Sequence, residues 1–181
     1  GRAVFDYSRV ERILGLLRKH GFTGPIPVYA PQAALARALP EGESLDTDMG
    51  RQALAELMRG MVDKYREYGL DVYFYPVDEP SASGPTFEAA KSQLARMKEV
   101  APECVTFSTC VLASAQALDE WLDVRCYTGL REGWLEDTAA AGDRAWEYGG
   151  IYSLSPNASI RLKGGFATLR TGVRGKLYWV Y

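Results

Sequence analysis

Two adjacent acidic residues, Asp78 and Glu79, follow an apolar run and are the strongest candidates for chemistry in the sequence. The run from Val72 to Val77 is rich in aromatic and β-branched residues, which predicts a buried strand. Neighbouring residues on a regular strand point to opposite faces, whereas a strand end that turns before Pro80 can aim both acids at one place. Barrels and open α/β sheets place their active sites at the carboxyl ends of parallel strands. The pair therefore favours an enzyme over the alternative of a solvated Asp-Pro turn.

Large aromatic and polar residues stand at the ends of several other predicted strands. Aromatic rings next to carboxylates suit sugars, because the C–H bonds of a sugar stack on rings while its hydroxyl groups need acceptors. Packing in a core is the alternative for each aromatic residue taken singly. Besides the acid pair, these strand-end residues are Tyr29, Thr109, Tyr127, Trp146, Glu147, Tyr148, Trp179 and Tyr181.

Two arginines, Arg161 and Arg170, lie on the last predicted helix, and for both a structural role is the first expectation. Their separation corresponds to about two and a half helical turns, so the side chains face opposite sides and at most one reaches a cleft. Arg161, near the start of the helix, is the better candidate. The expected substrate-binding residues are therefore Tyr29, Tyr127, Trp146, Glu147, Tyr148, Arg161 and Trp179.

Helices and strands alternate along the chain, which predicts parallel strands joined by right-handed crossovers. The expected strands span 26–30, 72–77, 104–109, 124–128, 145–152 and 176–180, and the last expected helix spans 160–171. No Gly-x-Gly-x-x-Gly follows a strand and no phosphate-binding loop motif occurs, so nucleotide-fold signatures are absent. The predicted fold class is α/β, a TIM-barrel-like (β/α)8 architecture that forms a partial barrel of about six parallel strands.

Composition limits the function further. The chain has 181 residues, 47% of them hydrophobic and 24% charged, which is typical of one globular domain spanning 1–181. A net charge of −2 gives no basic surface for nucleic acid, and no apolar run is long enough for a membrane span. The three cysteines and His20 lack metal-ligand spacing, so neither a metal nor a cofactor is expected. Cys104 and Cys126 are expected to be buried thiols.

Gly1 is not an initiator methionine, so we expect the chain to be a piece of a longer protein. Whether this chain is active alone is left open, as is its oligomeric state. The sequence does not indicate a cellular location; a secreted or extracytoplasmic one follows if a longer parent chain carries a signal peptide.

Three segments of the sequence resemble the catalytic barrel of glycoside hydrolase family 123 and of its relatives, the domain of unknown function 4091 proteins. The first is residues 75–80 (Tyr-Pro-Val-Asp-Glu-Pro), and the second is the strand around residues 146–148 (Trp-Glu-Tyr). The third is a closing segment with an arginine-bearing helix, a Gly-rich turn and a strand that ends in Trp. Its matching residues are Asn157, Arg161, Gly165, Arg170, Thr171, Gly172, Gly175, Leu177, Tyr178 and Trp179. The family's amino-terminal β domain and first barrel strands have no counterpart in this sequence.

The resemblance implies a carbohydrate substrate and retaining, substrate-assisted hydrolysis of N-acetyl-β-hexosaminides, with N-acetylgalactosamine favoured. In that scheme the 2-acetamido oxygen of the substrate attacks the anomeric carbon and forms an oxazolinium-type intermediate. The second acid, here Glu79, protonates the leaving oxygen and then activates water. The first acid, here Asp78, orients the acetamido group and stabilises its developing positive charge. This scheme is an exception to the usual pair of a nucleophilic and an acid/base carboxylate.

Two alternatives remain open from the sequence. In the first, Glu79 is the acid/base and Glu147 the nucleophile of an ordinary retaining glycosidase; against this, Glu147 is equally suited to pair with Arg144 or Arg161 as a structural residue. In the second, the chain is a partial barrel that binds carbohydrate without turnover, because fold alone does not determine function.

Overall fold

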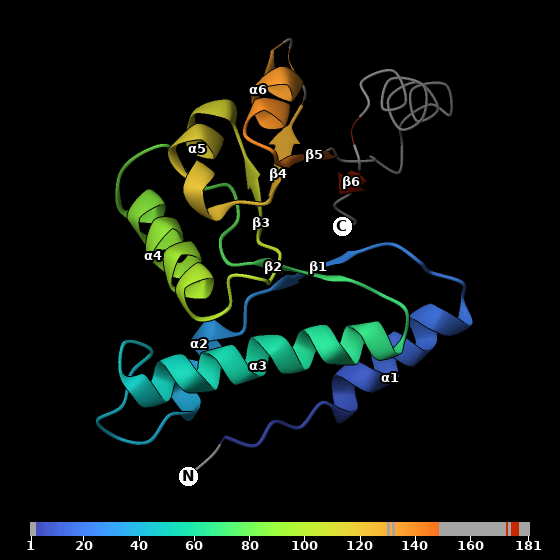
Figure 1. Ribbon diagram of the computed structural model, residues 1–181, viewed down its shortest axis with the longest axis vertical. Helices are drawn as coiled ribbons and strands as arrows, with labels where there is room; N and C mark the ends of the chain where they lie inside the picture. Colours follow the sequence, from blue (N-terminus) through green and yellow to red (C-terminus); the bar gives the residue numbers. More distant parts are fainter. Residues whose placement is uncertain (1–2, 130, 132, 149–172, 174, 178–181) are drawn as a thin grey trace, which may run out of the picture. The chain divides into compact units, whose positions relative to one another are not determined.

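The computed structural model describes residues 3–129, 131, 133–148, 173 and 175–177 (Figure 1). Its strands are β1 (Ile26–Tyr29), β2 (Val72–Tyr75), β3 (Phe107–Cys110), β4 (Val124–Thr128), β5 (Arg144–Tyr148) and β6 (Gly175–Leu177). Its helices are α1 (Ser8–Lys19), α2 (Gln32–Ala38), α3 (Asp48–Glu67), α4 (Pro85–Val100), α5 (Leu112–Ala117), the short 3-10 helix η1 (Asp119–Trp121) and α6 (Trp134–Ala140).

Every strand pair formed by the described residues is parallel, as the alternating pattern predicts. β1 pairs with β2, and β3, β4, β5 and β6 form a sheet in that order. The α/β class with parallel strands is therefore confirmed. A partial barrel of six strands stays a prediction, because the pairs form two separate sheets. The expected strand residues 149–152 and 178–180 and the expected helix 160–171 lie outside the described residues.

Contacts divide the chain into two compact units. Unit 1 comprises residues 1–76 and 92–106, and unit 2 comprises residues 77–91 and 107–181. The expectation of one domain spanning 1–181 stays a prediction, and each unit is described by itself.

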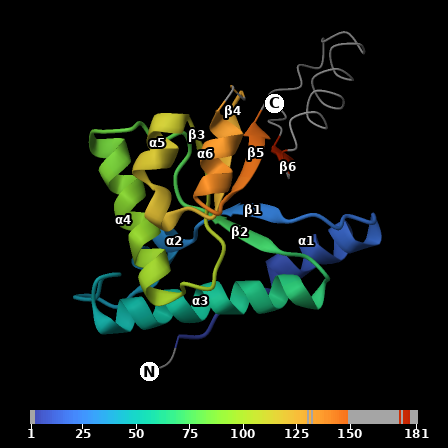
Figure 2. The same cartoon turned by 45° about the horizontal axis from the view of Figure 1, so that its top comes forward.

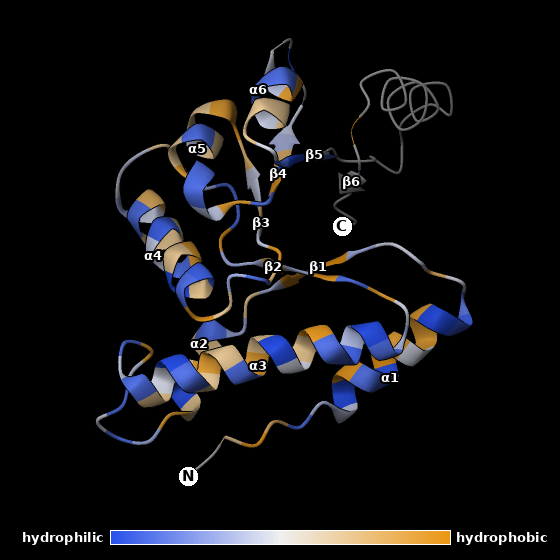
Figure 3. Cartoon of the chain, in the orientation of Figure 1, coloured by the Kyte–Doolittle hydropathy of each residue, from blue (hydrophilic) through white to orange (hydrophobic). Residues whose placement is uncertain are grey.

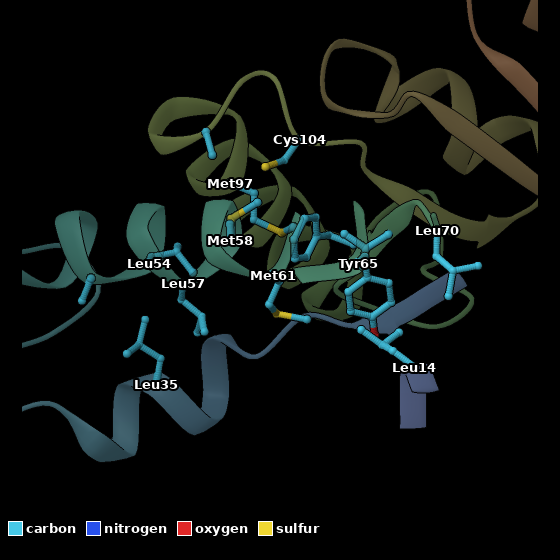
Figure 4. Close-up of a cluster of buried hydrophobic side chains, with 14 residues drawn as sticks. Leu14, Leu35, Leu54, Leu57, Met58, Met61, Tyr65, Leu70, Met97 and Cys104 are labelled. Atoms are coloured by element: carbon cyan, nitrogen blue, oxygen red, sulfur yellow. The ribbon is translucent and has the colours of Figure 1, made fainter. Parts of the chain in front are cut away.

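The long helix α3 organises the core of unit 1. Its N-cap is Thr47, whose side-chain oxygen accepts a hydrogen bond from the backbone N–H of Gly50 at 3.2 Å. Apolar residues recur along α3 at helical spacing (Figure 3). The spacing predicts an apolar face that includes Val62, which is only partly buried. The other side chains of that face are buried, and they pack with residues of α1, α2 and α4 (Figure 4). These α3 residues are Leu54, Leu57, Met58, Met61 and Tyr65.

The sequence predicts a helix from about Arg9 to His20, with Ser8 as its N-cap and Gly21 as the turn residue that follows it. Ser8 is the first residue of α1 and not its cap: Asp6 accepts a hydrogen bond from the Ser8 backbone N–H at 2.9 Å. At the other end His20 is the C-cap, and Gly21 follows with a φ of 72°. That left-handed conformation is favourable for glycine, which explains why the helix ends there.

Strand β2 is buried along its whole length, as expected for a parallel strand covered on both faces. It ends at Tyr75, two residues earlier than the apolar run predicts, because Pro76 has no backbone N–H to donate to a neighbouring strand. The backbone N–H of Phe74 donates to the carbonyl of Val105 at 2.8 Å. The acidic pair therefore follows in a turn and not on the strand itself.

The sheet of unit 2 has two distinguishable sides. Cys110, Tyr127 and Ala145 pack with apolar residues of α5 and α6, which lie beside the strands in Figure 2. We call this the helix-facing side. Phe107 and Trp146 make an edge-to-face ring contact on the opposite side, with ring centroids 5.4 Å apart. Because side chains alternate along a strand, each sheet residue can be assigned to one of these sides from its register.

A buried ion cluster lies on the helix-facing side. Arg125 of β4 is 1% exposed and contacts three carboxylates. Its guanidinium nitrogens lie 2.6 Å from Asp143 and 2.8 Å from Asp137, and a third nitrogen contacts Asp119. Burial raises the pKa of Asp143, and the Arg125 hydrogen bond opposes that increase. The cluster ties η1, α6 and the turn before β5 to one strand.

The three cysteines are buried and unbonded to one another, in agreement with the expectation for Cys104 and Cys126. Burial raises the pKa of Cys104 to about 11 and that of Cys110 to about 12, so both thiols stay protonated at neutral pH. No helix in the described part of the chain has the length and apolar character needed to cross a membrane.

Candidate functional site

The two acids of the turn after β2 are bound to one hydroxyl group. Thr109 of β3 donates its hydroxyl hydrogen to Asp78 Oδ1 at 2.7 Å. The same hydroxyl oxygen accepts the backbone N–H of Glu79 at 2.9 Å. A hydroxyl has one hydrogen to donate and two lone pairs to accept, so both bonds can exist together. Thr109 is fully buried, and it therefore ties the acidic turn to the carboxyl end of β3.

Glu79 has an unusual backbone conformation. Its φ is 43°, and it is the one non-glycine residue with a positive φ within the ranges that the structure describes. This region costs a residue with a Cβ about 1–2 kcal/mol, which surrounding contacts have to compensate. Because of this left-handed conformation, the side chains of Asp78 and Glu79 do not follow the alternating pattern of a β-strand. A regular strand would separate their side chains to opposite faces.

Glu79 lines a pocket of about 310 Å³. Its other lining residues come from the acidic turn itself and from the carboxyl ends of β3 and β4: Pro80, Ser81, Cys110, Val111 and Thr128. Val111 is 47% exposed, which is unusual for a large apolar side chain and gives the pocket an apolar wall. The pocket thus combines a carboxylate and two hydroxyl-bearing residues with apolar surface, a combination typical of small-molecule sites.

Trp146 and Tyr148 lie on the same side of the sheet as Thr109. Thr109 is in register with Cys126, and Cys126 with Trp146; Tyr148 follows two residues later on β5. Trp146 is 6% exposed, and its ring lies so close to β6 that a Cβ at Gly175 would overlap it. Trp146 is therefore mainly a packing residue in this structure. Tyr148 is half-buried nearer the carboxyl end of the strand.

Tyr127 and Glu147 lie on the helix-facing side. Tyr127 is fully buried, and its hydroxyl lies 2.7 Å from the Thr138 hydroxyl of α6. Glu147 is in register with Tyr127, and it is two residues beyond Ala145 on the same strand. Because Tyr127 and Ala145 both face the helices, each relation independently places Glu147 on the helix-facing side. The structure therefore places these two predicted site residues opposite to Thr109 and Trp146.

The remaining predicted substrate residues are distributed differently. Tyr29 ends β1 in unit 1, is 59% exposed, and stacks on Tyr75 with ring centroids 4.9 Å apart. Arg161 and Trp179, with Arg170 and Tyr181, lie outside the described residues, so the predictions that involve them stay predictions.

A larger cavity, of about 480 Å³, lies in unit 1 and is mostly apolar. Its lining includes Val4, Leu35 and Met49, and its polar residues are Gln52 and Glu56. Both lie on α3, and the Gln52 amide donates to Glu56 at 3.2 Å. The smaller pocket beside Glu79 is the better candidate for chemistry.

No group of three or more potential ligand side chains in the described ranges has an arrangement suited to a metal ion. The chemistry that the acidic turn offers is proton transfer and electrostatic stabilisation by carboxyl groups. Sequence analysis found both acids but assigned no role to Thr109, and it missed Ser81, Val111 and Thr128. The signal for Thr109, Val111 and Thr128 was their position at the carboxyl end of a parallel strand or immediately after it, where side chains from different strands meet. Ser81, which follows the acidic turn, had no such signal.

Comparison with known proteins identifies the fold. No protein-family model matches the sequence, and no characterised protein matches it either. Among solved structures, a psychrophilic glycoside hydrolase family 10 endo-β-1,4-xylanase is similar with a TM-score of 0.52 at 11% identity, covering 99% of this chain and 73% of the xylanase. A proposed α-L-fucosidase from Bacteroides thetaiotaomicron VPI-5482 is similar with a TM-score of 0.54 at 9% identity, covering 99% of this chain and 82% of that one.

At these low sequence identities, the similarities show the fold and do not show the activity or the substrate. The chain has a mixed α/β fold with parallel strands that resembles TIM-barrel-like glycoside hydrolases. The resemblance to glycoside hydrolase family 123 is not confirmed by these comparisons.

Proposed function

We propose that the chain is a glycoside hydrolase that acts on N-acetyl-β-hexosaminides, with N-acetylgalactosamine preferred, and that it uses a retaining, substrate-assisted mechanism. The main support for this proposal is the pair of consecutive acids, Asp78 and Glu79, which Thr109 holds next to a pocket at the carboxyl ends of the strands. The glycoside-hydrolase-like fold and the family resemblance of the sequence support it.

In the proposed reaction the carbonyl oxygen of the 2-acetamido group attacks the anomeric carbon as the glycosidic bond breaks. Glu79, which lines the pocket, gives its proton to the departing oxygen. Asp78 accepts a hydrogen bond from the acetamido N–H and stabilises the positive charge that develops there. Water then adds to the anomeric carbon, Glu79 takes its proton, and the acetamido group is restored with overall retention.

The bond between Asp78 and Thr109 is compatible with this role. An ionised carboxylate has about four lone-pair positions, so one bond to a hydroxyl leaves acceptor capacity for an amide N–H. Two neighbouring acids suit the mechanism because the glycosidic oxygen and the acetamido group are adjacent on the same sugar ring. The apolar Val111 wall offers a surface for the non-polar face of that sugar.

The alternative retaining mechanism, with Glu147 as the nucleophile, has weaker support. A nucleophile has to share a cleft with the acid/base at a carboxyl separation of about 5–5.5 Å. Glu147 is assigned to the helix-facing side together with Tyr127, whereas Thr109, which binds both candidate acids, is on the other side. Substrate assistance needs no second carboxylate nucleophile, so it fits the described geometry better.

Hydrolysis of matched chromogenic sugars tests the proposal. The purified chain is expected to release 4-nitrophenol from the β-N-acetylgalactosaminide and not from the β-galactoside, which differs only in lacking the acetamido group. The reason is that the substrate itself supplies the nucleophile. Asp78→Asn, which is expected to slow activated aryl substrates as well, serves as the background control for contaminating activity. Hydrolysis of neither sugar, or equal hydrolysis of both, would contradict the proposed function.

A further inference from the structure

Thr109 is a buried residue whose hydroxyl group makes two hydrogen bonds to the acidic turn. Its hydroxyl binds the side chain of one candidate acid and the backbone of the next. One atom, Thr109 Oγ1, thus connects the carboxylate of Asp78 with the peptide that carries Glu79. The O–H···O⁻ bond to Asp78 is charge-assisted and stronger than a neutral bond when that acid is ionised.

The backbone of Glu79 needs such a contact. Its left-handed φ of 43° is unfavourable for any residue with a Cβ, and glycine, which tolerates this conformation, is not the residue found here. The hydrogen bond from the Glu79 N–H to Thr109 holds the peptide in this orientation. Without this hydrogen bond, we expect the peptide to relax toward negative φ and to turn the Glu79 side chain away from the pocket, which it lines in this structure.

We propose that Thr109 is a positioning residue that sets the directions of both Asp78 and Glu79 through its single hydroxyl group. This inference rests on the proposed function for its catalytic consequence. Thr109 is not among the residues that line the pocket, and in this proposal it acts through the two acids. A displacement of reacting groups by about 1 Å can cost about 100-fold in rate, so one misplaced turn affects the chemistry strongly.

The neighbouring residue provides a matched control. Ser108 is also buried on β3, and its hydroxyl donates to the backbone carbonyl of Val77 at 3.1 Å. It therefore also ties β3 to the segment before the acids, but through a bond that involves neither acid. Ser108→Ala and Thr109→Val each remove one buried hydroxyl from adjacent positions, and only the second removes the bonds to Asp78 and Glu79.

The kinetic test combines these variants. Thr109→Val is expected to lower kcat about 10- to 100-fold with little change in KM, whereas Thr109→Ser, which keeps the hydroxyl, restores most of the rate. In the Asp78→Asn background the Thr109→Val substitution should add much less, because its effect passes partly through Asp78. Ser108→Ala is expected to add the same factor in both backgrounds. Equal rates for Thr109→Val and wild type, or a fully additive double variant, would overturn the inference.

A second measurement does not depend on activity. Hydrogen exchange at the Glu79 amide is expected to be slow in the wild type and in Thr109→Ser, because the N–H is bonded to a buried hydroxyl, and faster in Thr109→Val but not in Ser108→Ala. If the wild-type chain hydrolyses no hexosaminide, the proposed function fails while this exchange pattern still decides the positioning role. If exchange at Glu79 is equal in wild type and Thr109→Val, the positioning role fails whatever the activity.

Discussion

Glu79→Gln is expected to lower kcat for substrates with poor leaving groups, such as alkyl glycosides, by about 10²–10⁴-fold. The departing alkoxide needs a proton, and the glutamine side chain cannot supply it. Activated aryl glycosides, whose leaving groups are stable as anions, should lose much less in the first step. Steady-state and burst kinetics with a series of aryl and alkyl N-acetyl-β-galactosaminides measure this contrast as a steeper dependence of rate on leaving-group pKa.

Asp78→Asn is the matched variant for that experiment, because it changes the adjacent carboxylate in the same turn to an amide of equal size. It is expected to slow aryl and alkyl substrates alike, since the acetamido group has to be oriented and its charge stabilised whatever group departs. The same leaving-group dependence in both variants would show that the two acids do not have the separate roles proposed.

Arg125→Met is expected to lower the free energy of unfolding by about 3–5 kcal/mol. The substitution removes the guanidinium group that contacts Asp119, Asp137 and Asp143, and it takes away the ion pair between Arg125 and Asp143, whose side chain is 11% exposed. Urea unfolding of the wild type and the variant at pH 7 measures the difference. Arg59→Met is the control, because Arg59 pairs with Glu103 at the surface, where solvent screens the charges; its effect should be far smaller.

The destabilisation by Arg125→Met should depend on pH. Burial raises the pKa of Asp143 above its ordinary value of 3.8, and without Arg125 nothing in the cluster opposes that increase. A carboxyl whose pKa is raised in the folded state binds its proton more tightly there than in the unfolded chain, so stability falls as pH rises through the interval between the two pKa values. The deficit of the variant should therefore be smallest near pH 4 and larger at pH 7. A deficit that does not change with pH would show that lost packing, and not the buried charge, is the cause.

Local pattern predicted most of the described secondary structure, because it is determined by properties of neighbouring residues. The apolar spacing on α3 identified the buried side chains, and Gly21 marked the end of α1. The uniformly apolar run from residue 72 indicated a parallel strand buried on both sides. Its length was overestimated, since the apolar character of Pro76 and Val77 outlasts the hydrogen-bonded strand.

The candidate site was only partly predictable, because its geometry depends on residues that are distant in the sequence. Nothing near Thr109 in the sequence indicates that its hydroxyl binds a turn thirty residues earlier. Likewise, the place of Glu147 on a predicted strand suggested a nucleophile, and only the register of β5 with β4 assigns it to the helix-facing side. Arg125 was overlooked for the same reason: its three carboxylate partners come from three separate segments.

Inhibition by a galacto-configured thiazoline, a stable mimic of the oxazoline intermediate, tests the central proposal most directly. A site that stabilises the cyclised acetamido group should bind this mimic more tightly than substrate, because catalysis requires tightest binding near the transition state. The substrate-assisted mechanism predicts competitive inhibition in the wild type and a marked loss of affinity in Asp78→Asn. Absence of inhibition by the thiazoline, together with covalent labelling of Glu147 by a 2-deoxy-2-fluoro glycoside, would contradict it and establish the two-carboxylate mechanism instead.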